Sequence, residues 1–244
     1  MSTETYITIH DSLLIEKCEE EGYFKHLSHT YLFVGPREVN VSDNVKVIVC
    51  RDYSPNYEQY PHFYDFTGWF VLANSGLIKT DNAIFLQYDH LDVHSDIETV
   101  TEATLQNVPM VTFVPAPTMY FTLNIPNFYQ KQIEAVQACG FNLPTLLQER
   151  PFTVWPSTQG TAWRTEDFNK FMTWFEPVFE VLKDELYAGH LAERMIQVYL
   201  MVTDQTFTPI EGVVRHQRLD SHGTLDYSTG NLESFNKKAL TFGR

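Results

Sequence analysis

The sequence predicts a single α/β domain built on a mostly parallel sheet flanked by helices. The chain has 244 residues, 43% hydrophobic and 20% charged, which is typical of one folded globular domain. In its first half, short apolar runs bounded by Gly and Pro alternate with helical segments. Such alternation favours a parallel sheet covered by helices on both faces.

The expected strands are the short apolar runs at 6–10, 31–34, 45–50, 83–88, 108–114 and near Phe207. The expected helices are aromatic-rich, charged or periodic segments at 13–23, 62–74, 126–138, 166–186 and 189–201. Ligands of such sheets bind beyond the carboxyl ends of the strands. The residues that follow each strand are therefore the first candidates for a site.

Composition narrows the function classes. The formal net charge is −14 and no basic patch interrupts it, so we expect no nucleic-acid partner. The longest apolar runs are too short to span a membrane, and the N-terminus lacks a signal-peptide pattern. Cys18, Cys50 and Cys139 match neither a zinc site nor a disulfide framework. We expect a cytoplasmic protein, in the host cytoplasm if the source is viral.

Familiar catalytic signatures are absent from the sequence. It contains no phosphate-binding G-x-x-x-x-G-K-[ST] loop, no G-x-G-x-x-G, no G-x-S-x-G and no H-E-x-x-H. These absences argue against kinases, classical dehydrogenases, α/β-hydrolases and zinc proteases of the H-E-x-x-H type.

The run Ala83-Ile-Phe-Leu86 is continuous and apolar, as a central buried strand should be, and it leads into Gln87-Tyr88-Asp89. A carboxylate at the end of such a strand lies at the ligand cleft, where it can bind a divalent cation through oxygen. The cation would neutralise a diphosphate and stabilise a leaving nucleotide. The alternative interpretation of Asp89 is a solvated loop acid or the cap of the next turn.

This strand resembles that of GT-A fold glycosyltransferases, whose usual signature is an apolar strand followed by Asp-x-Asp. Here Gln87 replaces the first acid, while Asp89 keeps the last, which is commonly the metal ligand in that family. The blocks 64–74 and 81–89 look like a helix-then-strand unit of bacterial and large-virus glycan-type enzymes. Segment 160–168 is similar to their acceptor side, and 190–195 to the helix start that presents a catalytic acid.

The resemblance covers roughly residues 60–244 and implies the fold and the ligands. It implies one domain over 1–244, with a nucleotide-sugar-binding half at 1–115 and an acceptor half with the C-terminal tail at 116–244. The implied partners are a nucleotide-diphosphate sugar and a glycan acceptor. The implied cofactor is a divalent metal, Mn²⁺ with Mg²⁺ as the alternative, although Gln87 puts metal dependence in question.

Glu193 is the candidate catalytic base. Ala188-Gly189 precedes it, which predicts that Glu193 lies in the first turn of a helix, where the helix dipole favours an acid. There it can accept the proton of an acceptor hydroxyl, and direct displacement with such a base inverts the sugar. The alternatives are a Glu that only complements the dipole, or a base supplied by Glu166 or Asp167.

The remaining candidates follow from strand ends and the polar tail. His10 and Asp11 follow the first strand, where the resemblance implies the nucleotide base or ribose, and Asp52 is an alternative ribose partner. Gly160 and Trp163 are expected on the acceptor side. In the tail, His216 or His222 is expected to join Asp89 at the metal, and Arg215 or Arg218 to contact the diphosphate. The simpler alternatives are turn residues and an exposed tail.

The leading hypothesis is therefore a glycosyltransferase that moves a hexose-type sugar from a nucleotide diphosphate to a hydroxyl of a glycan, with metal assistance and inversion. One alternative is another nucleotide-dependent transferase, either a nucleotidyltransferase or a methyltransferase. The turn His10-Asp-Ser-Leu13 lacks the glycines that a methyltransferase would need there. The other alternative is a non-catalytic module that binds a glycan or nucleotide.

Overall fold

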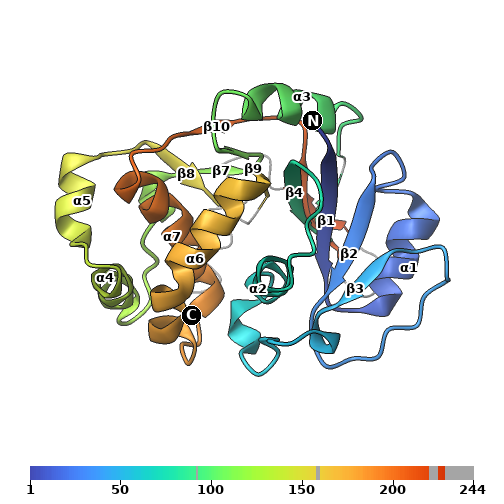
Figure 1. Ribbon diagram of the computed structural model, residues 1–244, viewed down its shortest axis with the longest axis horizontal. Coiled ribbons are helices and arrows are strands. Elements are labelled where there is room, and N and C mark those ends of the chain that lie inside the picture. The colour runs from blue at the N-terminus through green and yellow to red at the C-terminus, as the bar shows by residue number, and fades with distance from the viewer. Residues whose placement is uncertain (92, 158–159, 220–224, 229–244) are drawn as a thin grey trace.

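The computed structural model describes residues 1–91, 93–157, 160–219 and 225–228. Its centre is a seven-stranded sheet with helices on both faces (Figure 1). In spatial order the strands are β10 (Phe207–Pro209), β6 (Met110–Thr112), β9 (Thr161–Arg164), β4 (Asn82–Gln87), β1 (Thr3–Ile9), β2 (His29–Phe33) and β3 (Val47–Val49).

The sheet is mostly parallel, as the sequence predicts. β1 pairs in parallel with β2 and β4, β2 with β3, and β6 with β10. β9 is the exception, because it runs antiparallel between β4 and β6. This strand was not predicted, since its four residues lie between a turn and a long helix and carry no alternation of their own.

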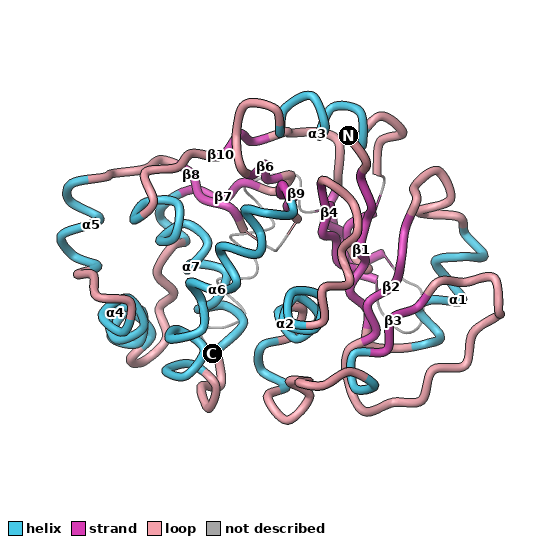
Figure 2. Tube along the Cα trace, in the orientation of Figure 1, coloured by secondary structure: helices cyan, strands magenta, loops and turns pink. Residues whose placement is uncertain are grey.

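The helices either cover this sheet or pack on the helices that do (Figure 2). They are α1 (Ser12–Glu21), α2 (Phe66–Asn74), α3 (Ile97–Leu105), α4 (Phe128–Ala138), α5 (Leu143–Glu149), α6 (Thr165–Leu182) and α7 (Ala188–Val202). Short 3-10 helices occur at Cys50–Asp52, Pro61–Phe63 and Thr118–Tyr120. The helix expected over 62–74 is thus split into a 3-10 turn and α2.

Smaller strands complete the fold outside the main sheet. β5 (His90–Leu91) pairs antiparallel with β11 (Arg215–Leu219), which also pairs with β12 (Leu225–Ser228). β7 (Pro115–Pro117) pairs with β8 (Val154–Pro156). Among the described residues, no helix combines the length and the apolar character needed to cross a membrane.

Alternation along the central strands produces two separate hydrophobic cores. In β4, Ala83 and Phe85 belong to one core, whereas Ile84 and Leu86 belong to the other. All four side chains are buried, which confirms the prediction that β4 is a central strand. One face packs on α2, α6 and α7, and the other on α1 and α3.

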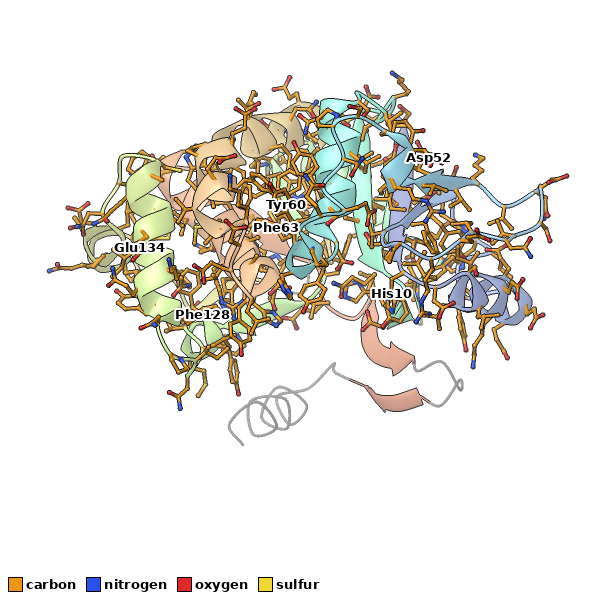
Figure 3. All side chains as sticks on the ribbon, turned by 90° about the horizontal axis from the view of Figure 1, so that it is seen from below. His10, Asp52, Tyr60, Phe63, Phe128 and Glu134 are labelled. Atoms are coloured by element: carbon orange, nitrogen blue, oxygen red, sulfur yellow. The ribbon has the colours of Figure 1, made fainter. Side chains whose placement is uncertain are left out.

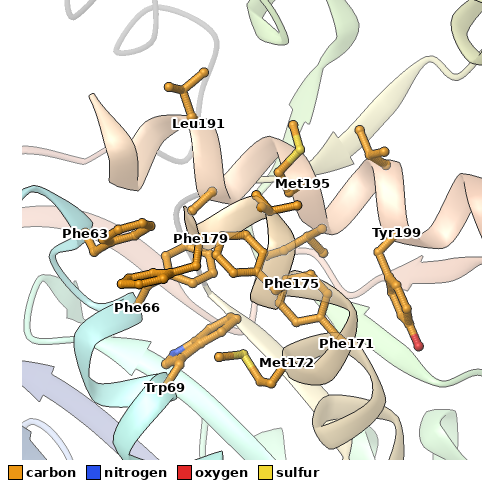
Figure 4. Close-up of a cluster of buried hydrophobic side chains, with 14 of the residues drawn as sticks. Phe63, Phe66, Trp69, Phe171, Met172, Phe175, Phe179, Leu191, Met195 and Tyr199 are labelled. Carbon is orange, nitrogen blue, oxygen red and sulfur yellow. The ribbon is translucent and has the colours of Figure 1, made fainter. Parts of the chain in front are cut away.

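The larger core is mostly aromatic where α2, α6 and α7 meet (Figure 4). Phe66 of α2 stacks on Phe175 of α6, with ring centroids 5.7 Å apart, and Trp69 contacts Phe85 of β4 at 4.7 Å. Aromatic pairs of this kind add to the stabilisation from burial alone. This packing holds α2 and the start of α7 in place beside the carboxyl ends of the strands.

Candidate functional site

A cavity of about 460 Å³ opens at the carboxyl ends of β1, β2 and β4. His10 follows β1, Val34–Pro36 follow β2, and Gln87–Asp89 end β4. The opposite wall is made by Tyr64 and Asp65 before α2 and by Gly189, His190 and Glu193 of α7. The cavity therefore lies where parallel α/β sheets bind ligands, and it joins segments from both halves of the chain.

Four carboxyl groups line this cavity: Glu58, Asp65, Asp89 and Glu193. The described residues that line it include His10 and His190 but no Lys or Arg. Burial raises the pKa of Glu58, whose carboxylate accepts a hydrogen bond from the backbone N–H of Gly35 at 2.7 Å. The cavity therefore concentrates acids in a partly desolvated space, which is unusual outside functional sites.

Asp65 is an acid whose ionisation the cavity strongly perturbs. Desolvation raises the pKa of its carboxyl to about 7, and the nearby charges of Asp89 and Glu193 push it in the same direction. The side-chain amide of Gln87 donates a hydrogen bond to Asp65, which opposes the rise. Gln87 stands in the position of the first acid of Asp-x-Asp. Its side chain is thus hydrogen-bonded to the carboxylate of Asp65, the residue before α2.

Asp89 is where the sequence analysis expects it, at the end of the buried strand β4 and in the cavity wall. The turn that follows is held by His90, whose buried ring accepts a hydrogen bond on Nδ1 from the backbone N–H of Gln87 at 2.9 Å. An accepting Nδ1 places the ring proton of a neutral imidazole on Nε2. His90 is thus a structural residue that fixes the end of β4.

Glu193 also lines the cavity, but not in the first turn of its helix. α7 begins at Ala188, which puts Glu193 in the second turn, and the first turn contains no acid. The predicted first-turn position of Glu193 is therefore wrong, although Glu193 does line the cavity. The Glu193 side chain is 12% exposed and lies 3.2 Å from the guanidinium of Arg194 and 3.8 Å from the His190 ring.

The Glu193 carboxylate is held by a hydrogen bond from the guanidinium of Arg194. This guanidinium is buried, lies 4.6 Å from the Trp155 ring centre and donates to the backbone oxygens of Tyr120, Phe121 and His190. Burial lowers its pKa to about 10, so it remains charged at neutral pH. A fixed positive charge beside Glu193 favours the ionised carboxylate that a base requires.

The start of α7 comes unusually close to the segment before α2. A Cβ on Gly189 would lie 2.7 Å from Cδ2 of Tyr64 and 3.0 Å from the backbone oxygen of His62. Tyr64 itself has a φ of 50°, which is strained for a residue with a bulky side chain. Gly189 thus permits the contact that closes the cavity, a role that no local sequence signal indicates.

His10 lies in the cavity wall as expected, with its ring edge-on to Tyr88 at 4.9 Å. Desolvation lowers the pKa of His10 despite the nearby charges of Asp11 and Asp89. The imidazole is therefore mostly neutral at pH 7, which allows it to donate and to accept hydrogen bonds from a polar ligand.

Asp11 and Asp52 do not line the cavity. Asp11 is buried and caps α1, because its side chain accepts from the backbone N–H of Leu13 at 3.0 Å and pairs with Arg37. Asp52 is in the 3-10 helix after β3, well away from His10 (Figure 3). Both predicted contacts with the nucleotide are corrected: Asp11 is structural, and β3 ends outside the cavity.

Gly160 and Trp163 also have structural positions. Trp163 is fully buried in β9, stacked on Phe171 at 5.3 Å, so its indole does not face an acceptor. Gly160 is buried, and a Cβ there would lie 3.1 Å from Cε1 of His90. The unexpected strand β9 takes Trp163 into the sheet, and the buried Gly160 directly precedes this strand, which corrects their assignment to the acceptor side. The alternative base Asp167 is likewise buried and bonded to Arg164.

The tail is described only in part. Arg215, His216 and Arg218 are in β11, and the backbone of His216 pairs with that of His90, directly after Asp89. The C-terminal segment therefore returns to the end of β4, as the resemblance implies. His222 lies outside the described residues, and the roles of the four tail residues stay predictions.

No protein-family model matches the sequence, and no curated protein matches it significantly. The fold is similar to solved structures. The apo structure of WbbM, a bifunctional glycosyltransferase, superimposes on 94% of this chain with a TM-score of 0.61 at 13% identity, and the chain spans 46% of that protein. A CMP:2-keto-3-deoxy-manno-octonic acid synthetase complexed with CTP matches over 99% of this chain and 98% of its own, at 13% identity and a TM-score of 0.47.

The likeness to WbbM shows the fold, and it confirms the predicted GT-A-like arrangement. The sequence resemblance and the spatial match thus agree on the architecture, although the identity is only 13%. A shared fold does not establish a shared activity, which depends on the residues of the cavity.

Proposed function

We propose that this chain is a glycosyltransferase that moves a hexose-type sugar from a nucleotide diphosphate to a hydroxyl of a glycan acceptor. The observation that carries the proposal is the convergence of Asp89, from the end of β4, and Glu193, from α7, in one cavity of a GT-A-like sheet. A cavity of about 460 Å³ has room for part of a nucleotide-sugar together with an acceptor hydroxyl.

In the proposed reaction, Glu193 accepts the proton of the acceptor hydroxyl while that oxygen attacks the anomeric carbon of the donor. The bond from this carbon to the diphosphate oxygen breaks, and the nucleotide diphosphate leaves with the electron pair. Attack from the face opposite the leaving group inverts the anomeric configuration. Arg194 supports the ionised state of Glu193 at 3.2 Å, and His10 offers hydrogen bonds to the nucleotide.

We further propose that a divalent metal, Mn²⁺ or Mg²⁺, assists this reaction. A diphosphate in a cavity lined by four acids needs a positive charge, which the ion would supply to the leaving group. Asp89 is the oxygen ligand best suited to hold it. Among the described residues, no group of three or more His, Cys, Asp or Glu is arranged as metal ligands. His216 or His222 of the tail is the proposed further ligand.

Thermal-shift assays with a panel of nucleotide-sugars, each with and without Mn²⁺, test the proposal. A ligand at 100 times its dissociation constant adds about 2.7 kcal/mol to the unfolding free energy. We expect at least one nucleotide-sugar to stabilise the protein, and Asp89→Ala to abolish any metal-dependent part of this gain. Asp52→Ala is the matched control, since Asp52 follows a strand outside the cavity.

The alternatives make different predictions in the same assay. Stabilisation by nucleoside triphosphates but by no nucleotide-sugar would favour a nucleotidyltransferase, and stabilisation by S-adenosylmethionine a methyltransferase. Nucleotide-sugar binding without transfer to any glycan would favour a binding module. If no nucleotide-sugar stabilises the protein under any metal condition, the glycosyltransferase proposal is wrong.

A further inference from the structure

A second hollow of about 660 Å³ lies between the segment 55–60, α2 and α6. We call it the tyrosine–amide groove, after Tyr57, Tyr60 and four Asn or Gln side chains that line it. It shares the segment 55–60 with the acidic cavity, because Glu58 lines the cavity whereas Tyr57 and Gln59 line the groove. Figure 3 shows Tyr60 next to Phe63, in the segment that leads into α2.

The apolar part of the groove combines four aromatic rings with Pro55, Ala73, Met172 and Pro177. Tyr57 packs against Phe70 of α2 with ring centroids 4.5 Å apart, and Tyr60 meets Phe179 of α6 edge-on at 5.2 Å. The two phenylalanines are buried, while both tyrosines stay partly exposed. Neighbouring residues already hold these rings in place. A ligand that packs on them therefore loses little binding free energy to the ordering of side chains.

The polar part of the groove consists mainly of neutral side-chain amides. They come from the segment 55–60 and from both helices: Asn56, Gln59, Asn74 and Asn169. The amide of Asn74 donates to the hydroxyl of Tyr57 at 2.9 Å, which orients both groups. An amide offers donors and an acceptor side by side, which suits hydroxyl groups that also donate and accept.

Charge further narrows the ligand class. The groove is lined by Glu176 and Glu180 and by no Lys or Arg among its residues, all of which the structure describes. Glu180 is paired with Lys183 on the rim at 2.7 Å. A phosphorylated or otherwise anionic ligand would meet acids without a lining cation, so the groove disfavours it.

We propose that the tyrosine–amide groove is a second binding site, which takes the neutral sugar units of an oligosaccharide. The apolar face of a sugar ring packs on the exposed parts of Tyr57 and Tyr60, and its hydroxyls bond to the amides and Glu176. The proposal does not depend on transfer in the acidic cavity, because it concerns binding by other side chains.

The test uses the full chain on a glycan array of neutral, sulfated or sialylated, and amino-sugar oligosaccharides, followed by calorimetry with the best neutral one. We expect selective binding of neutral oligosaccharides. Tyr60→Ala should weaken the binding about tenfold, because it removes one ring contact. Thr173→Trp, at an exposed position of α6 in the groove, should weaken it at least as much by filling the space.

Tyr129→Ala is the matched control, because it removes a partly exposed ring that lines neither hollow. It should leave oligosaccharide affinity unchanged. If Tyr60→Ala fails to fold, Thr173→Trp still tests the proposal. The proposal is overturned if no neutral oligosaccharide binds, if charged ones bind better, or if Thr173→Trp leaves the affinity unchanged. Donor stabilisation in Thr173→Trp, measured in parallel, reports on the acidic cavity separately.

Discussion

The acidic cavity and the tyrosine–amide groove share one segment and both lack a lining Lys or Arg among the described residues, yet most of the side chains that line them are of different kinds. The cavity lies where three parallel strands end, and it collects four carboxyl groups and two histidines. The groove lies between helix surfaces and presents rings and neutral amides. The ends of parallel strands bring polar residues from distant segments to one point, which favours a catalytic site. Helix faces offer broader surfaces, which favour a binding site.

Among the variants that test this difference between cavity and groove, Glu193→Gln is expected to have the largest effect, which is on kcat. The amide keeps the shape of the side chain but cannot accept the hydroxyl proton, so kcat should fall by about 10²–10⁴-fold. Donor stabilisation in the thermal-shift assay should persist. Glu166→Gln is the control, because Glu166 is exposed on α6 and pairs with Lys170. A Glu193→Gln enzyme with most of its activity would exclude this residue as the base.

The second effect concerns Asp65 and pH. Its folded pKa of about 7 lies above the ordinary value near 4, so the folded protein holds a proton that the unfolded chain has released. The unfolding free energy should therefore fall as pH rises from about 4 to about 7, by up to about 4 kcal/mol. Asp65→Asn should remove this loss and make the protein more stable than the parent at pH 8.

Urea unfolding at pH 5 and pH 8 measures the Asp65 effect. Asp52→Asn is the control, since Asp52 lies in an exposed turn outside the cavity. Equal pH dependence in the parent and in Asp65→Asn would show that the carboxyl titrates normally and that the cavity is more solvated than its acids indicate.

The smallest effect is expected for Gly189→Ala. Alanine normally stabilises a helix relative to glycine, but here its methyl group would meet Tyr64 and the His62 oxygen. We expect a net loss of about 1–3 kcal/mol of unfolding free energy, measured in urea. Combining it with Tyr64→Ala should recover part of the loss, because the nearest contact is gone. A Gly189→Ala protein as stable as the parent would mean that α7 and the segment before α2 can separate easily.

Features that depend on nearest neighbours along the chain could be predicted from the sequence alone. The apolar run 83–86 has no polar position, so it had to be a strand buried on both faces, and Asp89 had to follow its end. His10 after β1 is predictable in the same way. The mostly parallel sheet of the first half also follows from the alternation of strands and helices.

Contacts between residues far apart along the chain could be known only from the folded structure. The packing of α2 and α7 on α6 brings three further residues to the cavity: Glu58, Asp65 and Gly189. No local sequence pattern predicts this packing. Trp163 and Gly160 are buried because β9 pairs between β4 and β6, although the sequence alone led us to expect them on the acceptor side. Burial depends on the partner strand and its register, which are set by contacts between residues far apart in sequence.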